Sequence, residues 1–435
     1  MKIHTWNTLT EQQQTQLLQR PELQSQEDLR AKTAEIIAEV RARGDTALKD
    51  YTVQFDHVQL DDLTVSPQAF AVADDVSEDA RAAMQLAIRQ IEAVHQAQMP
   101  QELSVEATPG VKCVRQTRPI ARVGLYVPGG SAPLISTLMM LAVPAKIAGC
   151  PLRVLCTPPN KDGQIDAHIL AAAQLCGIDK IFKIGGAQAV AAMAYGTATI
   201  PKVDKIFGPG NAWVTQAKIL VAQDPQGASY DLPAGPSEVL VIADETANAE
   251  FVALDLLSQA EHDVAAQVIL LTTSMLLGQQ ICGTIERQLA KLPRRKIIEQ
   301  SLAHSRLLVV DDIATAIAIS NRYAPEHLIM QVAEAEQHMA AIHYAGTVFL
   351  GSMAAEVLGD YVTGSNHVLP TYGFARVSGG LALTDFLKFI SFQSMTAEGL
   401  QAIGPAAEKL AEIEGLHAHQ QAVSVRLKDL KKGEK

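Results

Sequence analysis

The feature that most constrains this fold is a repeated unit, in which a short β-rich run ends at a glycine or proline turn and an alanine-rich helical stretch follows. In the first half, the β-rich runs are ARVGLYV (121–127), LRVLCT (152–157), DKIFKI (179–184) and VDKIF (203–207). A second series contains EVLVIA (238–243), AQVILLT (266–272), SRLLVV (305–310) and GTVFLG (346–351). This alternation is typical of parallel α/β sheets. We expect two α/β halves that meet near the PAGP motif at 233–236.

Composition narrows the classes of protein further. A chain of 435 residues with 48% hydrophobic residues is long enough to bury more than one core. Its net charge of −11 repels polyanions, so nucleic acid is not expected as a partner. The five cysteines form no C-x-x-C pair and have mostly apolar neighbours, which indicates buried thiols in a reducing compartment.

Neither the first residues nor the longest uncharged stretch predicts export or a membrane span. The first residues are rich in glutamine and lack the apolar run of a signal peptide, so we expect a cytoplasmic protein. The uncharged stretch 124–145 is interrupted by proline and glycine, which favours a strand, a loop and a short buried helix.

Residues 27–50 have helical spacing up to a glycine stop at Gly44. Beyond about residue 384 the β signal disappears, and 406–430 reads as helix.

Three polar or aromatic residues stand at strand-to-helix turns, where a nucleotide can bind. Asn211 ends a GPGN turn, but Trp213 occupies the place of the third glycine of a dinucleotide fingerprint, so a plain tight turn competes with a phosphate site. Gln188 follows Gly185-Gly186 and is either a ribose or base contact or a helix-surface residue. Tyr126 either lines a crevice or belongs to the core.

A second set of polar residues suggests metal binding and proton transfer. Gln259 and His262 are three residues apart, so a helix projects them to one face, although a helix end with a solvated histidine is the commoner outcome. Adjacent Glu326 and His327 can divide proton transfers, or they can cap an element. Asp360 lies in an irregular, polar, glycine-bounded sequence after the GTVFLG strand, and we expect a loop at the carboxyl end of the sheet.

Two further positions are less defined by local pattern. His419 is either a further metal ligand or a surface helix residue. Ser237 is not part of a G-x-S-x-G elbow, so it reads as a hydrogen-bonding residue and not as a nucleophile.

Several of these motifs together resemble those of the histidinol dehydrogenase family. The run DLPAGPSEVLVIAD (231–244) is followed in order by LLSQAEH (256–262), YAPEHL (323–328) and NHVLPTYG (366–373), after GPGN at 208–211. The resemblance extends from the N-terminal arm to the final helix. It implies a zinc-dependent oxidation of L-histidinol to L-histidine through bound histidinal with two NAD, the last step of histidine biosynthesis.

The resemblance also implies a domain organisation with two similar, incomplete Rossmann-like domains. We expect an N-terminal arm (1–24), a first α/β domain (25–125 plus 238–381) with most metal and catalytic residues, a second, NAD-binding α/β domain (126–237), and a C-terminal helical tail (382–435). The family implies a homodimer that exchanges this tail, so that Glu414 and His419 complete the partner's site.

Site residues are carried over from the family position by position. Zinc is expected on Gln259, His262, Asp360 and His419, a set of oxygen and nitrogen donors that suits this ion. The substrate is expected to contact these four residues and also Ser237, His327 and Glu414. His327 resembles the general base for the alcohol, Glu326 the residue that activates water on the aldehyde, and NAD is expected to contact Tyr126, Gln188 and Asn211.

Two rival functions remain at this stage. A zinc hydrolase would also use a metal, a glutamate and a histidine to activate water, and it predicts turnover without nicotinamide. A catalytically inactive relative that binds metal or nucleotide as a regulator predicts loss of a key residue, and no matched position is substituted.

Overall fold

The computed structural model describes residues 2–21, 26–129, 133–233 and 235–433, so Gly130, Ala234 and residues 22–24 of the predicted arm lie outside it. The chain divides into two compact units. The larger contains Met1–Gln98 and Ile120–Phe386, and the smaller contains Met99–Pro119 and Leu387–Lys435.

The first sheet of the larger unit is parallel, with the strand order β6-β5-β4-β7-β8. Four of its strands confirm the first predicted series, and the short β8 was not predicted. The strands are β4 (Arg122–Tyr126), β5 (Leu152–Thr157), β6 (Lys180–Lys183), β7 (Lys205–Phe207) and β8 (Ser229–Tyr230). The connecting helices are α5 (Ile135–Ile147), α6 (Ala167–Cys176), α7 (Gly186–Tyr195) and α8 (Ala212–Ala222).

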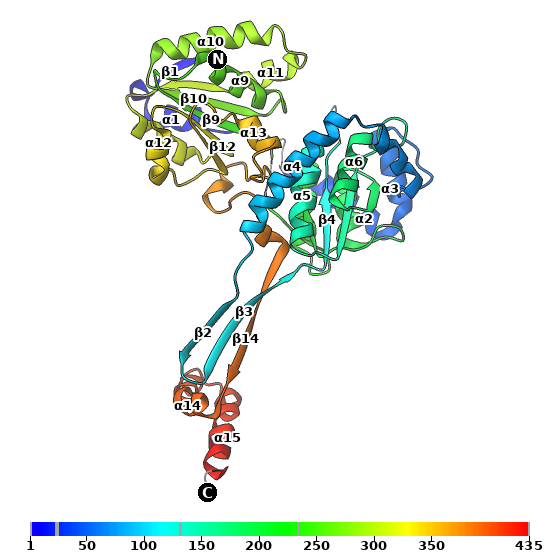
Figure 1. Ribbon diagram of the computed structural model, residues 1–435, viewed down its shortest axis with the longest axis vertical. Coiled ribbons are helices and arrows are strands. Elements are labelled where there is room, and N and C mark those ends of the chain that lie inside the picture. Colours follow the sequence, from blue (N-terminus) through cyan, green and yellow to red (C-terminus); the bar gives the residue numbers. More distant parts are fainter. Residues whose placement is uncertain (1, 22–25, 130–132, 234, 434–435) are drawn as a thin grey trace. The chain divides into compact units, whose positions relative to one another are not determined.

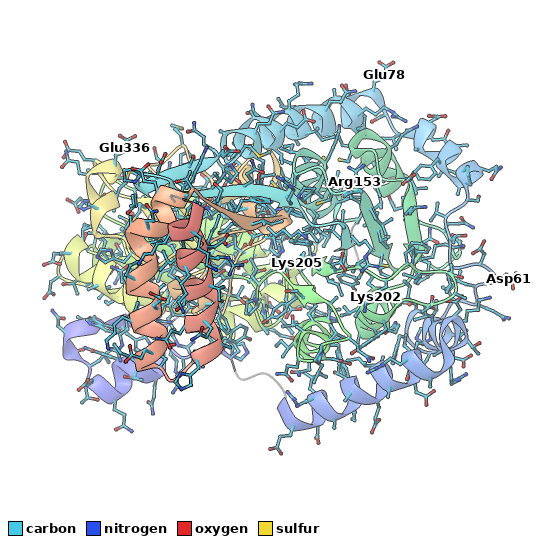
Figure 2. The ribbon with its side chains drawn as sticks, turned by 90° about the horizontal axis from the view of Figure 1, so that it is seen from below. Asp61, Glu78, Arg153, Lys202, Lys205 and Glu336 are labelled. Atoms are coloured by element: carbon cyan, nitrogen blue, oxygen red, sulfur yellow. The ribbon has the colours of Figure 1, made fainter. Side chains whose placement is uncertain are left out.

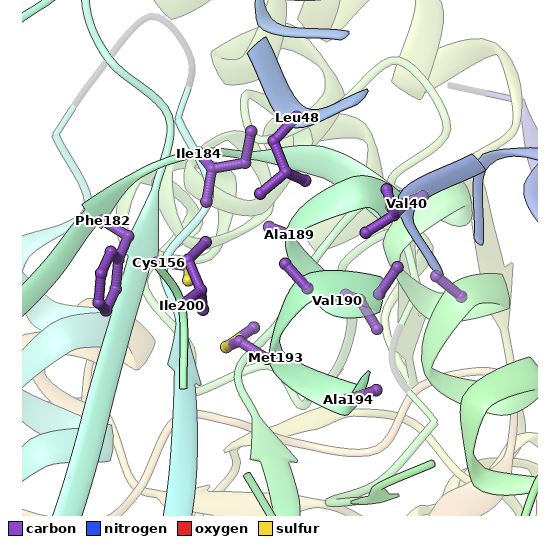
Figure 3. Close-up of a cluster of buried hydrophobic side chains, with 14 of the residues drawn as sticks. Val40, Leu48, Cys156, Phe182, Ile184, Ala189, Val190, Met193, Ala194 and Ile200 are labelled. Carbon is purple, nitrogen blue, oxygen red and sulfur yellow. The ribbon is translucent and has the colours of Figure 1, made fainter. Parts of the chain in front are cut away.

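Three N-terminal helices add an outer layer to this sheet (Figure 1). They are α2 (Gln26–Arg43), α3 (Asp45–Tyr51) and α4 (Glu78–Ala97). Helix α2 packs on α7 and α8, and α4 packs on α5 and α6. Val40 and Leu48 share a core with Val190 of α7, as Figure 3 shows. The prediction that residues 25–125 form one domain with 238–381 therefore fails for residues 26–97, because an amphipathic helix does not encode which sheet it covers.

The second sheet is also parallel, with the order β1-β11-β10-β9-β12-β13. Its strands are β1 (Ile3–Thr5), β9 (Glu238–Ala243), β10 (Gln267–Thr272), β11 (Arg306–Val309), β12 (His327–Gln331) and β13 (Thr347–Leu350). Four were predicted. Strand β12 was missed because its first residues were interpreted only as a site motif, and β1 shows that the predicted arm supplies an edge strand.

Helices cover both faces of this second sheet, so its central strands are buried on both sides. Val239 and Val241 point into the core beneath α9 and α10, whereas Leu240 and Ile242 point to the opposite core with α12. This alternation follows from the two-residue period of a strand. The helices are α1 (Glu11–Leu17), α9 (Ala249–Ala260), α10 (Met275–Leu289), α11 (Arg295–Ala303), α12 (Ile313–Tyr323) and α13 (Glu356–Tyr361).

Short helical turns complete the larger unit. They are the 3₁₀ turns η1 (Trp6–Thr8), η3 (Pro67–Asp75), η4 (Ala335–Ala341), η5 (Phe374–Arg376) and η6 (Leu383–Phe386), and the π turn η2 (Thr52–Asp56). Asp61, Glu78 and Glu336 point away from the ribbon in Figure 2, and all three are exposed acids that contribute to the net charge.

The smaller unit contains a three-stranded antiparallel sheet, which corrects the prediction of a purely helical tail. Strand β14 (Leu387–Met395) pairs with β3 (Val111–Pro119), which pairs with β2 (Leu103–Thr108). Helices α14 (Ala397–Ile413) and α15 (His417–Gly433) follow and pack on each other. Strand β14 was missed because no glycine turn of the repeated unit flanks LKFISFQSM. Its partner β3 also precedes it by almost 300 residues.

The predictions for the cysteines and for the uncharged stretch 124–145 can be compared with the structure. Cys150, Cys156 and Cys176 are buried as expected, but Cys113 is exposed on β3. The uncharged stretch forms β4, a loop and the buried helix α5, as predicted. Among the described residues, no helix is both long enough and apolar enough to span a membrane.

Arg20 fixes the N-terminal segment to the second sheet. Its Nε and Nη2 donate to the two carboxylate oxygens of Glu238 at 2.5 and 2.8 Å, and Nη2 also donates to the carbonyl of Tyr323 at 3.1 Å. The guanidinium lies 4.0 Å above the Tyr323 ring centroid. Only 15% of the Arg20 side chain and 3% of the Glu238 side chain are exposed, so neither charge is well solvated.

Substitution Arg20→Ala is expected to lower the free energy of unfolding by about 3–5 kcal/mol, because it leaves the Glu238 carboxylate buried without its cation. Urea unfolding followed by circular dichroism measures this loss. Arg43→Ala is the control, since the Arg43–Asp50 pair is 45% and 60% exposed. Its loss should cost much less, because water screens an exposed ion pair. Equal losses of unfolding free energy in the two variants would contradict the proposed role of the Arg20–Glu238 pair.

Candidate active site

A cluster of buried polar residues lies at the amino ends of strands β9 and β12. Glu238 and His327 are the first residues of these strands, and His327 pairs in register with Val239 and Thr347. Helix α13 returns from the far end of β13 and brings Asp360 back to this edge. The prediction that Asp360 lies in a loop at the carboxyl end of the sheet is therefore wrong, because the helix carries it across the strand's length.

His327 is the centre of this cluster. Its Nδ1 lies 3.0 Å from the carbonyl oxygen of Glu238 and 3.1 Å from the amide Nε2 of Gln259. With a proton on Nδ1, the ring donates to the Glu238 carbonyl and leaves Nε2 without a proton. That nitrogen lies 3.6 Å from Oε1 of Glu356. In this tautomer Nε2 is the proton acceptor, whereas a hydrogen bond donated by the Gln259 amide to Nδ1 would favour the other tautomer.

Two carboxylates set the charge of this ring. Burial alone would lower the pKa of His327, but Glu326 and Glu356 outweigh burial and raise that pKa to about 10. Glu326 Oε2 lies 3.5 Å from Nδ1 and accepts a hydrogen bond from the backbone N–H of Glu238 at 2.8 Å. Burial raises the pKa of Glu326. Adjacent Glu326 and His327 thus form a buried proton-sharing pair.

A divalent metal ion fits beside this pair. Ligand atoms of His327, Glu356 and Asp360 lie within 4.8 Å of one another. Oε1 of Gln259 and Oε1 of Glu356 are buried without a hydrogen-bond partner among the described residues. An unsatisfied buried acceptor costs free energy unless a cation or donor meets it. The orphaned oxygen of Gln259 is therefore evidence for a cation at this position.

His262 follows α9 within reach of the same charges. The surrounding protein atoms lower the pKa of its imidazole, although part of the residue is open to solvent, and the negative charge of Asp360 acts in the opposite direction. A neutral imidazole is the form that binds a metal. His262 is exposed, but Asp360 and His327 both act on its charge, so it lies near the cluster that contains Gln259. Binding of a metal by Gln259, His262 and Asp360 stays a prediction.

His367 was not predicted, and it links this cluster to the first sheet. Its Nδ1 donates to the carbonyl oxygen of Asp360 at 2.9 Å, and its Nε2 lies 3.5 Å from Thr137 Oγ1 in the first turn of α5. A backbone acceptor on Nδ1 fixes the ring and helps to position Asp360.

The remaining predicted site residues lie in different places. Ser237 precedes Glu238 at the amino edge of β9 and is half-buried. Glu414 and His419 belong to the smaller unit, where Glu414 caps the end of α14 and His419 lies in the first turn of α15; both are exposed there. Their participation in the metal and substrate site stays a prediction.

A separate cavity of about 1030 Å³ opens at the carboxyl edge of the first sheet. Tyr126, Gln188 and Asn211 all line it, so the three predicted nucleotide contacts share one site. Tyr126 is the last residue of β4, Gln188 lies in the first turn of α7, and Asn211 caps α8. Parallel α/β sheets bind ligands at this edge. Helix α3 and the turn Thr52–Asp56 form another part of the wall.

Backbone geometry explains the turns of this cavity. The N–H of Gly186 donates to the hydroxyl of Tyr126 at 3.0 Å, and its φ of 70° favours glycine. A Cβ on Gly186 would lie 2.6 Å from Oε1 of Gln188, so the Gln188 side chain folds directly over this backbone. Oδ1 of Asn211 accepts from the N–H groups of Trp213 and Val214, which leaves its amide nitrogen for a ligand.

A buried ion pair supports the GPGN turn. Lys218, almost fully buried, pairs with Asp231 and donates to the carbonyl of Gly208 at 2.9 Å, while Asp231 accepts from the N–H of Gly208 at 2.7 Å. Gly208 has φ of 120°, and a Cβ there would lie 2.1 Å from the carbonyl oxygen of Tyr126. The turn is fixed by close approach and by charge, without the standard glycine fingerprint.

Sequence reasoning missed four residues of the buried polar cluster, namely Arg20, Glu238, Glu356 and His367. Glu238 and His367 lie within motifs that were recognised, so their positions beside Ser237 and Asn366 offered a signal. Arg20 and Glu356 offered none, because only the folded chain brings them to the cluster.

Substitution Gln259→Ala is expected to weaken binding of a divalent ion by more than the roughly 10–100-fold that is typical of residues that only orient a ligand. Zinc retained after dialysis against a chelator measures this change by atomic emission. Glu250→Gln is the control, because Glu250 is exposed on the same helix. Retention equal to that of the control would show that the orphaned oxygen of Gln259 does not bind the metal.

Comparison with known proteins gives one consistent family. A sequence model of histidinol dehydrogenase matches residues 18–427. The chain is 50% identical over 430 residues to histidinol dehydrogenase from Escherichia coli (strain K12), covering 99% of this chain and 98% of that protein. For the Vibrio cholerae (serotype O1) protein of the same name, identity is 48% over 435 residues, covering both chains fully.

A solved structure agrees with these relatives. The crystal structure of histidinol dehydrogenase from Elizabethkingia anophelis has a TM-score of 0.94 and 48% identity, and the match covers 99% of this chain and 98% of that chain. Because the family model, the relatives and the solved structure all agree, the chain belongs to the histidinol dehydrogenase family and is an oxidoreductase.

Proposed function

We propose that this protein oxidises L-histidinol to L-histidine through a retained histidinal, with two NAD per histidine and one zinc ion per subunit, in the cytoplasm. The reaction is the last step of histidine biosynthesis. The observation that carries the proposal is the cluster at the amino edge of the second sheet, where His327 lies between Glu326 and Glu356 beside the orphaned oxygen of Gln259. Family membership supports the substrate.

In the first oxidation, His327 accepts the hydroxyl proton of the substrate. Its Nδ1 donates to the Glu238 carbonyl, so Nε2 holds the lone pair that receives this proton. As the O–H bond breaks, the carbon–oxygen double bond forms and the carbon loses a hydride. The products of this step are the aldehyde, one reduced nicotinamide and one proton.

In the second oxidation, Glu326 removes a proton from the water that adds to the aldehyde carbon. The backbone N–H of Glu238 holds Oε2 of Glu326 in place at 2.8 Å, so the carboxylate is oriented before the water arrives. Loss of a second hydride from the hydrated aldehyde gives the carboxylic acid. Because the aldehyde stays bound in a buried site, it is protected from side reactions.

Zinc and NAD are proposed to bind at two separate sites. Gln259, His262 and Asp360 would hold the metal, which would bind the substrate's imidazole and amino groups and, by its charge, favour the unprotonated form of His327. Tyr126, Gln188 and Asn211 would hold NAD, which accepts the hydride. Ser237, beside Glu238, is proposed to contact the substrate.

The homodimer completes this proposal. Glu414 and His419 are exposed on the smaller unit, which makes both side chains available to another subunit. We infer that the partner's tail contributes them, with His419 as the fourth metal ligand and Glu414 as a substrate contact. No membrane or nucleic-acid partner is proposed.

Stoichiometry tests the reaction. Adding histidinol and NAD to zinc-loaded protein is expected to give two NADH for each histidine, because each hydride reduces one NAD. A chelator should abolish turnover, and zinc should restore it. Turnover of amide or ester substrates without nicotinamide would instead support a hydrolase, and folded, zinc-loaded protein that forms no NADH would overturn the proposal.

The proton-transfer roles of His327 and Glu326 can be separated by mutation. His327→Ala is expected to lower histidinol oxidation by about 10²–10⁴-fold, since it removes the general base. Glu326→Gln should mainly slow oxidation of supplied histidinal, with a smaller effect on the alcohol step. Glu261→Gln, a change of a neighbouring acid outside the pair, serves as the control. Equal turnover of histidinal by wild type and Glu326→Gln would remove the proposed role of Glu326.

Mixed dimers test the exchanged tail. Asp360→Asn and His419→Asn should each be inactive alone, but a purified heterodimer of the two chains contains one site with all four wild-type ligands. We expect it to recover about half of the wild-type activity, as a shared site in a twofold dimer requires. A heterodimer as inactive as its parents would place both ligands in one chain.

A further inference from the structure

The cavity lined by Tyr126, Gln188 and Asn211 also holds a carboxylate that the proposed function does not use. Asp56 lines this cavity, and its Oδ2 is shielded from solvent without a hydrogen-bond partner among the described residues. An unmatched buried acceptor does not stabilise the fold. A ligand that donates a hydrogen bond to this oxygen would offset the cost of burying it.

The backbone around Asp56 is shaped for this position. Residues Thr52–Asp56 form a π turn, a rare conformation that occurs frequently at functional sites. His57 follows with φ of 58°, in the left-handed region that non-glycine residues rarely adopt. The amide of Val58 donates to the carbonyl of Thr52 at 3.4 Å, and Thr52 itself is buried. The carboxylate is therefore presented by a strained, fixed turn.

Charge in the same cavity limits which nucleotide can bind. Among the described lining residues, Glu35, Asp56 and Asp166 carry negative charge and Lys32 carries positive charge. Lys32 and Glu35 are exposed on α2, whereas Asp56 is half-buried. A buried anion repels the additional 2′-phosphate of NADP more strongly than an exposed anion does, because water screens the buried charge less.

We propose that Asp56 accepts hydrogen bonds from the adjacent hydroxyl groups of the adenosine ribose and thereby selects NAD over NADP. The inference rests on the proposed binding of NAD in this cavity. Ribose hydroxyls supply the donors that Oδ2 lacks, and a carboxylate performs this role in dinucleotide-binding folds that have a full glycine fingerprint. A 2′-phosphate removes one donor and places a dianion beside the Asp56 carboxylate.

A binding measurement tests this role without turnover. Trp213 lines the cavity, and the chain has only two tryptophans, so a Trp6→Phe background isolates the Trp213 fluorescence. Titration with NAD and with NADP then gives a dissociation constant for each. Asp56→Asn is expected to weaken NAD binding about tenfold or more, the effect of losing a charged hydrogen bond. NADP binding should stay equal or strengthen, so the preference for NAD falls at least about tenfold.

Asp166→Asn is the matched control, because its carboxylate lines the same cavity but already accepts a hydrogen bond from the N–H of His168 at 2.8 Å. It should leave the ratio of the two dissociation constants nearly unchanged. An unchanged ratio in Asp56→Asn, or an equal shift in both variants, would overturn the proposal. Asp56→Ser, checked for an unaltered unfolding transition, replaces Asp56→Asn if that variant does not fold.

Kinetics separates this inference from the proposed function. With histidinol as substrate, Asp56→Asn should raise the KM for NAD while kcat stays near the wild-type value. If wild-type protein binds NAD at Trp213 but forms no NADH from histidinol, the proposed function fails and the Asp56 inference stands. If wild type turns over with two NADH per histidine and the Asp56 variants keep its nucleotide preference, only the inference fails.

Discussion

The buried carboxylate of Glu238 is the group on which the rest of the catalytic arrangement depends. Its side chain binds Arg20 and accepts from the N–H of Tyr372, its backbone N–H orients Glu326, and its carbonyl fixes the His327 ring. A charge so deeply buried is tolerated only with a full set of partners. The same partners therefore hold the N-terminal segment, strand β12 and the proton-transferring pair in one geometry.

The two sheets use opposite edges for their chemistry. The cavity proposed to bind the nucleotide lies at the carboxyl edge of the first sheet, where helix N-termini and turns offer N–H groups. The cluster proposed to bind the metal and transfer protons lies at the amino edge of the second sheet, because α9 and α13 both return there. Helix α5 connects the sites, since Leu134 before it lines the cavity and Thr137 within it contacts His367.

Much of the candidate site could be predicted, and the failures have physical causes. Motifs located Gln259, His262, Glu326 and His327 because these residues are close in sequence or lie beside distinctive neighbours. Glu356 could not be found, since nothing in its local sequence marks it as a neighbour of His327. Asp360 was found, but on the wrong edge, because a six-residue helix reverses the direction that the preceding strand implies.

Local sequence determined the α/β class, eight of the strands and most of the chemical groups, because hydrophobic period and glycine turns are encoded within a few residues. Tertiary structure alone decided that residues 26–98 cover the first sheet, that β14 pairs with β3, and that Arg20 neutralises Glu238. These contacts join segments that are far apart in the chain. Their selection depends on complementary surfaces and on satisfying buried charges, which no local pattern records.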